Sequence, residues 1–62
     1  MVDQSNVTVV EVFEGEDGMF YFHGKAGNGE IVAESEAYTR KSDALEAGGR
    51  VFPAAEVKEL EA

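Results

Sequence analysis

The sequence predicts an α+β fold in which antiparallel strands precede a single helix. Three observations support this prediction. A β-branched and aromatic run extends from Val7 to Glu14, an Asn28-Gly29 step separates two strand-like runs, and apolar residues recur at helical spacing before Pro53. The chain has 62 residues and contains no repeat, linker or low-complexity segment. We therefore expect one domain over residues 1–62.

The run from Val7 to Glu14 predicts the first strand. Strict alternation would place Val7, Val9 and Phe13 on one face and two further valines, Val10 and Val12, on the other. A strand that is apolar on both sides indicates a central position in the sheet or a protein contact. The turn from Gly15 to Gly18 leads into the second strand, and loop lengths of two to five residues all remain open.

The Asn28-Gly29 step predicts a two-residue type I′ hairpin turn. In that register Gly27 lies opposite Glu30, Lys25 opposite Val32, His23 opposite Glu34, Phe22 opposite Ser35 and Phe20 opposite Ala37. The core face would then carry Phe20, Phe22, Gly24, Ala26, Ile31, Ala33, Ser35 and Ala37. The other, mostly solvated face would carry Tyr21, His23, Lys25, Glu30, Val32, Glu34, Glu36 and Tyr38.

A helix is expected to settle into the shallow groove beside Ala33, with Thr39 or Ser42 as its N-terminal cap and Asp43 in its first turn. Its apolar stripe would consist of Ala44, Leu45, Gly48, Val51 and Phe52. Pro53 ends the helix, because proline cannot continue the hydrogen-bond ladder.

Gly48 and Gly49 leave the end of the helix open to two interpretations. Either they lie inside a helix that approaches the sheet closely, with Gly48 facing Ala33 and Ala37, or the helix ends at Ala47 with Gly48 in its C-terminal cap. We favour the first interpretation, because apolar residues continue the stripe beyond the glycines. The local pattern of the tail, residues 54–62, indicates a frayed helix.

Size and composition favour an oligomer. A chain of this length buries only about 60% of its unfolded surface, so a monomeric core is marginal. The sequence has no cysteine and a single histidine, which excludes disulfides, thiolate zinc sites and a histidine cluster for a metal. Residues 1–6 are too few and too polar for a signal peptide, and there is no transmembrane-length apolar run. We therefore expect no cofactor, no membrane contact and a cytoplasmic location.

The net charge of -8 is opposite in sign to that of a typical nucleic-acid binder. The 13 acidic residues are dispersed along the chain and do not form a block. This distribution favours an adaptation to solubility and high salt, as in proteins of salt-loving organisms, over an acidic surface for a basic partner.

Candidate catalytic groups are better explained structurally. Ser35 and His23 would lie on opposite faces of the hairpin, so they cannot form a nucleophilic pair, and His23 is instead expected to pair with Glu34 across the strands. Glu34 and Glu36 would share a solvated face with no apolar pocket around them. We expect no catalytic, cofactor-binding or metal-binding residues, and no enzyme.

The segment VEVFEGEDGMFYFHGKAGNGEIVAESEAYTRK, from Val10 to Lys41, resembles the YegP-like family of small uncharacterised proteins, which carry a domain of unknown function. The resemblance extends to Val51, and the Asn28-Gly29-Glu30 core with Ser35-Glu36 and Tyr38-Thr39 carries most of it. It implies a three-strand, helix, strand unit (βββαβ). It also implies a homodimer that builds a shared sheet and exchanges C-terminal strands, which reassigns residues 56–61 as a swapped strand.

The resemblance transfers no functional residue. Relatives often carry arginines where Tyr21 and His23 stand, and an apolar residue where Gly48 stands. We therefore expect an acidic, homodimeric structural or interaction module. The alternative is a nucleic-acid or anion-binding protein that uses basic residues near the helix, Arg40, Lys41 and Arg50.

Overall fold

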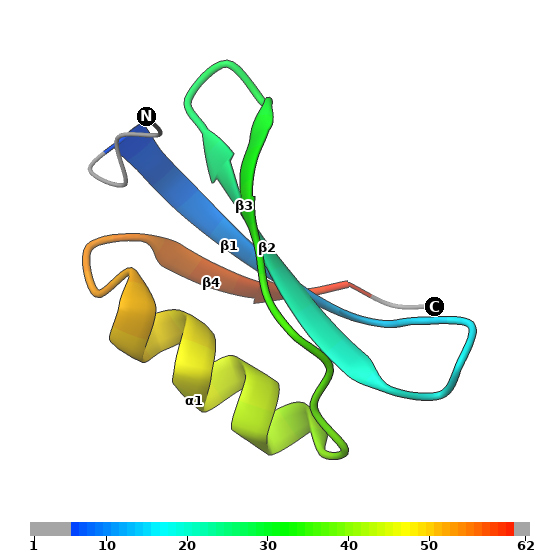
Figure 1. Ribbon diagram of the computed structural model, residues 1–62. Coiled ribbons are helices and arrows are strands. Elements are labelled where there is room, and N and C mark those ends of the chain that lie inside the picture. Colours follow the sequence, from blue (N-terminus) through cyan, green and yellow to red (C-terminus); the bar gives the residue numbers. More distant parts are fainter. Residues whose placement is uncertain (1–5, 61–62) are drawn as a thin grey trace.

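The computed structural model describes residues 6–60, which form a four-stranded sheet with one helix packed on one face (Figure 1). The elements are β1 (Val7–Glu14), β2 (Phe20–Ala26), β3 (Ile31–Glu34), α1 (Lys41–Val51) and β4 (Glu56–Glu59). The strand order is β3-β2-β1-β4, in which β1 to β3 are antiparallel neighbours and β4 lies parallel to β1. The predicted α+β class and element order are confirmed, and the parallel pair makes the sheet mixed.

Strand β1 lies at the centre of the sheet, between β2 and β4, as its two-sided apolar pattern indicated. Its register on β2 slips by one residue between Val7 and Val9, which leaves Thr8 as an extra residue. This bulge turns Val7 to the same face as Val10 and Val12, and all three are buried. The prediction that Val7 shares a face with Val9 is therefore wrong, because alternation does not continue across a bulge.

The first hairpin closes with a three-residue loop that ends in a left-handed glycine. The Gly15 N–H donates to the Met19 carbonyl over 2.8 Å, and the Gly18 N–H donates to the Gly15 carbonyl over 3.0 Å. Gly18 has a φ of 79°, which glycine adopts without strain. The loop is thus a type I turn followed by a glycine bulge, one of the lengths that the sequence left open.

The second hairpin closes in the same way. The Ala26 N–H donates to the Glu30 carbonyl and the Gly29 N–H donates to the Ala26 carbonyl, each over 2.9 Å. Gly29 has a φ of 85°, whereas Asn28 does not have a positive φ. The predicted two-residue type I′ turn is therefore wrong, because that turn needs a positive φ at both of its central residues.

A second slip, between Gly24 and Lys25, partly restores the predicted register. Gly24 pairs with Ala33, and His23 with Glu34 as predicted, but Lys25 pairs with Ile31 and leaves the next residue of β3 as a bulge. As a result Ile31, predicted to lie in the core, is 49% exposed. Its neighbour Val32, predicted to be solvated, packs against the core.

The predicted register also fails at the other end of the hairpin. Phe20 pairs with Tyr38 and not with Ala37, through backbone hydrogen bonds of 2.7 and 2.8 Å. Tyr38 packs against the core, its ring 6.3 Å from that of Phe22, while Ala37 is exposed. Strand β3 has already ended at Glu34, so strict pairing does not extend this far.

Helix α1 passes through both of its glycines, which confirms the longer of the two predicted helices. Its N-cap residue is Arg40, and no side chain caps it, so the prediction of a Thr39 or Ser42 cap is wrong. The buried residue Phe52 forms the C-cap, and Pro53 follows as predicted.

The helix packs on the central strands and not in the groove beside Ala33. A side-chain carbon at Gly48 would lie 2.8 Å from Val10 Cγ1 and 3.5 Å from Phe22 Cγ. The predicted contact of Gly48 with Ala33 and Ala37 is therefore wrong. Val51, expected on the apolar stripe, is 48% exposed. The core consists of Val7, Val10, Val12, Phe22, Ala44 and Phe52.

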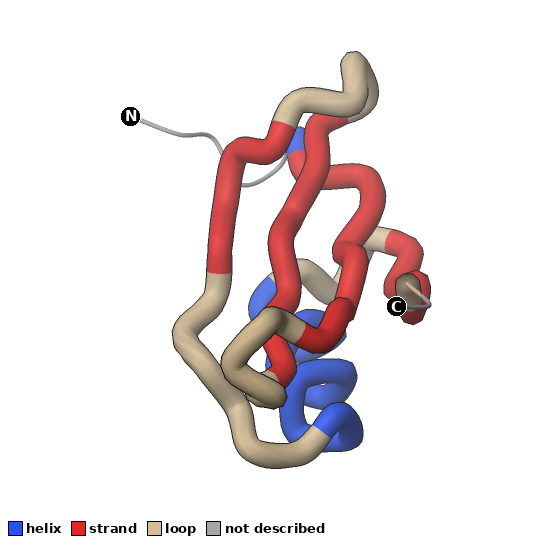
Figure 2. The backbone as a smooth tube through the Cα atoms, turned by 90° about the vertical axis from the view of Figure 1, so that its right-hand side faces the viewer, coloured by secondary structure: helices blue, strands red, loops and turns tan. Residues whose placement is uncertain are grey.

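The C-terminal segment is a strand, as the resemblance implied, and not the frayed helix that its local pattern indicated. Strand β4 pairs with β1 of the same chain, with Val57 beside Val10, and the Leu60 N–H donates to the Val12 carbonyl over 2.8 Å. The predicted swapped strand extended to Glu61, which lies outside the described residues. Figure 2 shows the connection from β3 leaving the sheet and leading into α1, which returns the chain to this edge.

Candidate functional site

The face of the sheet opposite α1 carries a cluster of polar and aromatic side chains, which we call the open face: Glu11, Phe13, Tyr21, His23 and Lys25. Successive residues of a strand point to opposite sides, and their neighbours on β1 and β2 point into the core. Glu11 pairs with His23 and Phe13 with Tyr21 across the two strands. No helix of residues 6–60 packs on this face.

A shared carboxylate organises the polar half of the open face. Glu11 Oε1 lies 2.6 Å from His23 Nε2 and 3.2 Å from Lys25 Nζ. The Glu11 and His23 side chains are only 15% and 14% exposed. The hydrogen bond from His23, and then that from Lys25, holds the pKa of Glu11 below its ordinary value.

The prediction of a His23–Glu34 pair is correct for the backbone and wrong for the side chains. The two residues lie opposite each other on β2 and β3, but the imidazole turns to Glu11 on the other neighbouring strand. Sequence reasoning missed Glu11. A three-residue first loop, one of the lengths left open, would have placed it opposite His23.

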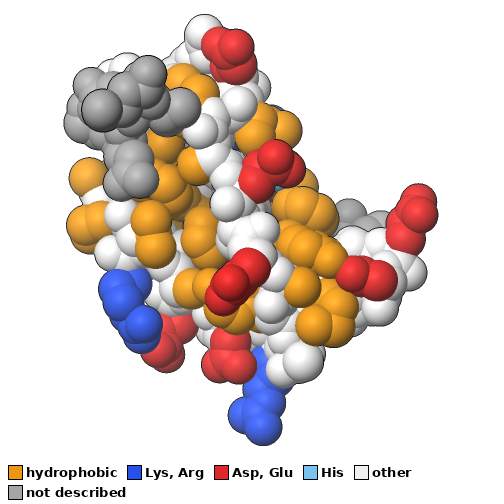
Figure 3. Space-filling model, viewed as in Figure 1, with side chains coloured by type: hydrophobic (Ala, Val, Ile, Leu, Met, Phe, Trp, Pro, Cys, Tyr) orange, Lys and Arg blue, Asp and Glu red, His pale blue; other side chains and the backbone are white. Residues whose placement is uncertain are grey.

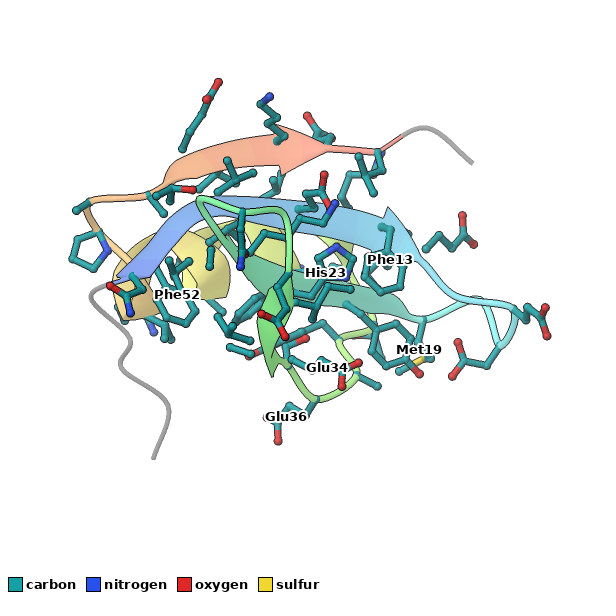
Figure 4. The ribbon with its side chains drawn as sticks, turned by 90° about the horizontal axis from the view of Figure 1, so that it is seen from above. Phe13, Met19, His23, Glu34, Glu36 and Phe52 are labelled. Carbon is teal, nitrogen blue, oxygen red and sulfur yellow. The ribbon has the colours of Figure 1, made fainter. Side chains whose placement is uncertain are left out.

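Phe13 lies between two rings on the aromatic half of the open face. Its ring centroid is 5.8 Å from that of Tyr21, nearly parallel at 22°, and 5.0 Å from that of His23, tilted by 41°. Figure 4 shows Phe13 and His23 side by side, with Glu34 lying further out. These contacts fix the His23 ring against Phe13 on one side while Glu11 holds its Nε2.

Tyr21 links the first hairpin loop to the aromatic half of the open face. The Tyr21 hydroxyl donates to the Asp17 carboxylate, and the Met19 N–H donates to Asp17 Oδ1 over 2.9 Å. The bond from Tyr21, followed by that from Met19, lowers the pKa of Asp17. The same bond to Asp17 raises the pKa of Tyr21, because the neighbouring carboxylate disfavours a phenolate.

Ser35 does not contribute to the open face. Its hydroxyl accepts a hydrogen bond from the Phe22 N–H and donates one to the Glu36 carbonyl, both over 2.8 Å. These bonds hold the chain where it leaves β3.

The remaining carboxylates do not converge either. Glu34 and Glu36 are both exposed, and Glu36 lies beyond the end of β3, so the two do not share one strand as predicted. Within residues 6–60, no group of three or more His, Asp or Glu side chains is placed to hold a metal ion.

The basic residues of the alternative function are spread along α1. Lys41 Nζ lies 3.5 Å from a Glu59 oxygen, and Arg50 donates to Glu46 over 2.5 Å one turn away. Arg40 and Arg50 stand at opposite ends of the helix. On the face drawn in Figure 3, Lys and Arg side chains occupy two separate places, and the acidic side chains are scattered over the face.

The fold and this surface define a small α+β module whose polar groups bind one another. Within the described segment, no buried side-chain nitrogen or oxygen lacks a hydrogen-bond partner. The helix of this segment is not long and apolar enough to cross a membrane. The arrangement is a cross-strand network of polar and aromatic side chains.

The sequence profile of the domain of unknown function DUF1508 matches residues 16–59. The chain therefore belongs to this family, which confirms the resemblance to the YegP-like proteins, since they carry this domain. The matched range begins after β1, so Glu11 and Phe13 lie outside it. No curated protein and no solved structure matches the chain.

Proposed function

We propose that the protein is a homodimeric structural or interaction module without catalytic activity, in which two copies exchange β4. The observation that carries this proposal is the exposure of β4. All four of its residues are exposed, and two large apolar side chains at this edge, Val57 and Leu60, are 37% and 41% exposed. A second copy that packs against this edge would remove apolar surface from water.

The small core supports the same proposal. Only six hydrophobic residues are buried among residues 6–60, and they include two phenylalanines, Phe22 and Phe52. A domain of this size usually needs a disulfide, a metal or a second subunit to be stable. The sequence contains no cysteine, so a second copy is the remaining common means of stabilisation.

Strand exchange needs little rearrangement. The β4 strand of a second copy can pair with β1 in the register that places Val57 beside Val10, so every β1–β4 bond of the single chain has an equivalent in the dimer. Only the connection after Phe52, residues 53–55, must change direction. Exchange of an identical element is a low-cost route to a dimer for this reason.

A pair of cysteines tests the exchange directly, since the natural chain has none. Val9 and Glu56 are paired residues of β1 and β4, at a spacing that a disulfide can bridge. In the double variant Val9→Cys with Glu56→Cys, oxidation of an exchanged dimer yields a covalent dimer on a denaturing gel. A closed chain yields an intrachain disulfide and migrates as a monomer.

Two controls make this result specific. Each single-cysteine variant must stay monomeric on the same gel, and the unmodified protein must melt at a temperature that rises with its concentration. An intrachain disulfide in a particle that light scattering shows to be dimeric would overturn the exchange alone. A folded monomer whose melting temperature does not depend on concentration would overturn the dimer as well.

The same proposal interprets the acidic composition as an adaptation to high salt. The net charge of -8 is doubled in a dimer, and because it already counts every lysine and arginine, the described ion pairs do not reduce it. Salt screens such repulsion, with a Debye length of about 10 Å at 0.1 M and about 3 Å at 1 M. Molar potassium chloride should therefore raise the urea midpoint, and an unchanged midpoint would contradict the adaptation.

Nucleic-acid or anion binding is the less favoured function, because Lys41 and Arg50 each lie against a glutamate. A polyanion column provides the test. Retention that is lost when both residues are replaced by glutamine would favour this function over the module.

A further inference from the structure

We propose that the Asn28-Gly29 step is a self-modification site, at which the folded hairpin slowly converts the Asn28 amide into a carboxylate through a cyclic imide. This reaction needs no enzyme, metal or cofactor. It requires a side-chain amide, a following backbone nitrogen that is sterically accessible, and groups that stabilise the reaction. All three are present at the tip of the β2–β3 hairpin.

The nucleophile is the backbone nitrogen of Gly29. Asn28 and Gly29 are both exposed, and apart from these two residues and Glu30, no described atom lies within 4 Å of the place that a side chain at Gly29 would occupy. Glycine also leaves the backbone free to rotate toward the neighbouring side chain. Asn6, the other asparagine of the chain, is followed by Val7, whose branched side chain hinders the same approach.

The electrophile is Asn28 Cγ, and the turn already polarises its carbonyl group. The Glu30 N–H donates to Asn28 Oδ1 over 3.0 Å. This oxygen becomes negatively charged when the nitrogen adds to Cγ, so the bond strengthens in the transition state, as in an oxyanion hole. The Asn28 amide nitrogen donates to Glu30 Oε2 over 3.5 Å, which places a carboxylate beside the leaving group.

The reaction balances without an external reagent other than water. The bond from Gly29 N to Asn28 Cγ forms, the bond from Cγ to Nδ2 breaks, and the proton lost by Gly29 N leaves with Nδ2 as ammonia. Glu30 can carry that proton between the two nitrogens. Water then opens the imide at one of its two carbonyls, which gives either aspartate or isoaspartate, whose backbone runs through the side chain.

Opening of the hairpin tip controls the rate. The Gly29 N–H donates to the Ala26 carbonyl over 2.9 Å, and this bond must break before the nitrogen can attack. The tip is poorly protected, since the four residues that follow Ala26 are exposed and β3 itself has only four residues and a bulge. Segments of this kind open locally at low free-energy cost.

The first hairpin is the natural comparison, because it holds an aspartate in the equivalent place. Asp17 precedes Gly18 as Asn28 precedes Gly29, and it accepts the matching bond from the Met19 N–H. Its carboxylate is ionised and bound by Tyr21, and an ionised carboxylate is a poor electrophile. An aspartate at position 28 would retain the turn bond but would place a second negative charge beside Glu30.

The test is incubation of the purified full chain at neutral pH and physiological temperature, followed by ion-exchange chromatography and peptide mass spectrometry. We expect a time-dependent shift to a more acidic species, release of ammonia, and conversion at Asn28 while Asn6 stays intact. Asn28→Gln should abolish the shift on the same timescale, because its longer side chain would have to close a six-membered ring, which forms far more slowly than the five-membered imide.

Glu30→Gln provides the matched test of the assisting group. It preserves the size of the side chain and should slow the conversion several-fold while the turn still forms. Conversion at Asn28 no faster than at Asn6 would overturn the proposal. Conversion that occurs only in urea-unfolded chain would also overturn it, because the folded hairpin would then protect the site.

Discussion

The two faces of the sheet are built from alternate residues of the same strands, yet they differ in burial and in the kinds of side-chain contact. On the covered face, Val10, Val12 and Phe22 pack against Ala44 and the bare backbone of Gly48. On the open face, the side chains of Glu11, Phe13, Tyr21, His23 and Lys25 bind one another beside solvent. Close packing of apolar side chains stabilises the covered face, whereas ion pairs and contacts between rings stabilise the open face.

This difference indicates which residues contribute most to stability and which can be substituted at small cost. A packed interior responds to any change in volume, because neighbouring atoms cannot relax freely. The rings and ion pairs of the open face are half-buried and no helix of residues 6–60 packs over them, so truncating one of them exposes the gap to water and removes less buried surface. The open face can therefore change in sequence at small cost, whereas the covered face cannot. The predictions below test this difference, from the largest expected effect to the smallest.

Phe22→Ala on the covered face should destabilise the protein by about 3 to 5 kcal/mol, the usual loss for a buried phenylalanine. That loss is comparable to the whole stability of a small domain, so most of the protein should be unfolded. Phe13→Ala on the open face is the matched control and should cost about 1 to 2 kcal/mol. Circular dichroism without denaturant measures the unfolded fraction of Phe22→Ala, and urea denaturation measures the loss in Phe13→Ala; equal losses would abolish the distinction between the faces.

Adjacent glycines of α1 give a sharper comparison. Gly48→Ala should destabilise by about 1 to 2 kcal/mol, because the added methyl group would lie 2.8 Å from Val10 Cγ1, in a residue that is fully buried. Gly49→Ala should instead stabilise by up to about 1 kcal/mol, since no atom lies within 4 Å and alanine favours helix. A stabilised Gly48→Ala variant in urea denaturation would show that the contact with β1 is loose.

Glu11→Gln tests the polar network of the open face through its pH dependence. The pKa of Glu11 is lowered in the folded protein, so its contribution to stability is present above its ordinary pKa and is lost as the pH falls through the folded value. The variant should flatten the acid decline of the urea midpoint over that window. Glu34→Gln, an exposed carboxylate without an ion pair among residues 6–60, should leave the decline unchanged.

Tyr21→Phe is expected to have the smallest effect, because it preserves the stacking on Phe13 and removes only the bond to Asp17. The pKa of Asp17 should return toward its ordinary value, so the variant should be less stable than the unmodified protein above that value, and the difference should disappear as the pH falls through the lowered pKa of Asp17 in the unmodified protein. The alkaline side changes too. The raised pKa of Tyr21 contributes stability below its ordinary pKa, which is lost as the pH rises through the folded value. An Asp17 titration by NMR that matches the unmodified protein would contradict this account.

The sequence predicted the elements and their order better than the contacts between them. The central place of β1 and the helix through Gly48 follow from residue patterns and are confirmed. The alignment of His23 with Glu34 is also as predicted, but only because the three-residue loop and the bulge at Val32 offset each other. The bulges at Thr8 and Val32 were not predicted, because each is a single extra residue that no periodic pattern records. Because of these bulges, the side chains of Val7 and Ile31 lie on the face opposite to the predicted one.

Tyr21, His23 and Lys25 were predicted to share the solvated face, but the β1 half of the open face was missed for a related reason. Glu11 belongs to a strand whose register depended on an undetermined first loop, so its pairing with His23 could not be deduced. The strand character of residues 56–59 was likewise absent from the local sequence and came only from the family resemblance. Tertiary pairing overrides weak local propensity in such short segments.

The parallel pairing of β4 with β1 joins the two ends of the chain, and it therefore constrains the order of folding. The β1–β2–β3 meander needs only short loops and can form early. The pairing of β4 with β1 must instead close a long loop that contains β2, β3 and α1. Until it does so, the outer edge of β1 stays unpaired. In the proposed exchange, a β4 strand from another molecule would compete with the chain's own strand during that interval, so the protein concentration at which folding takes place would determine the ratio of closed to exchanged chains.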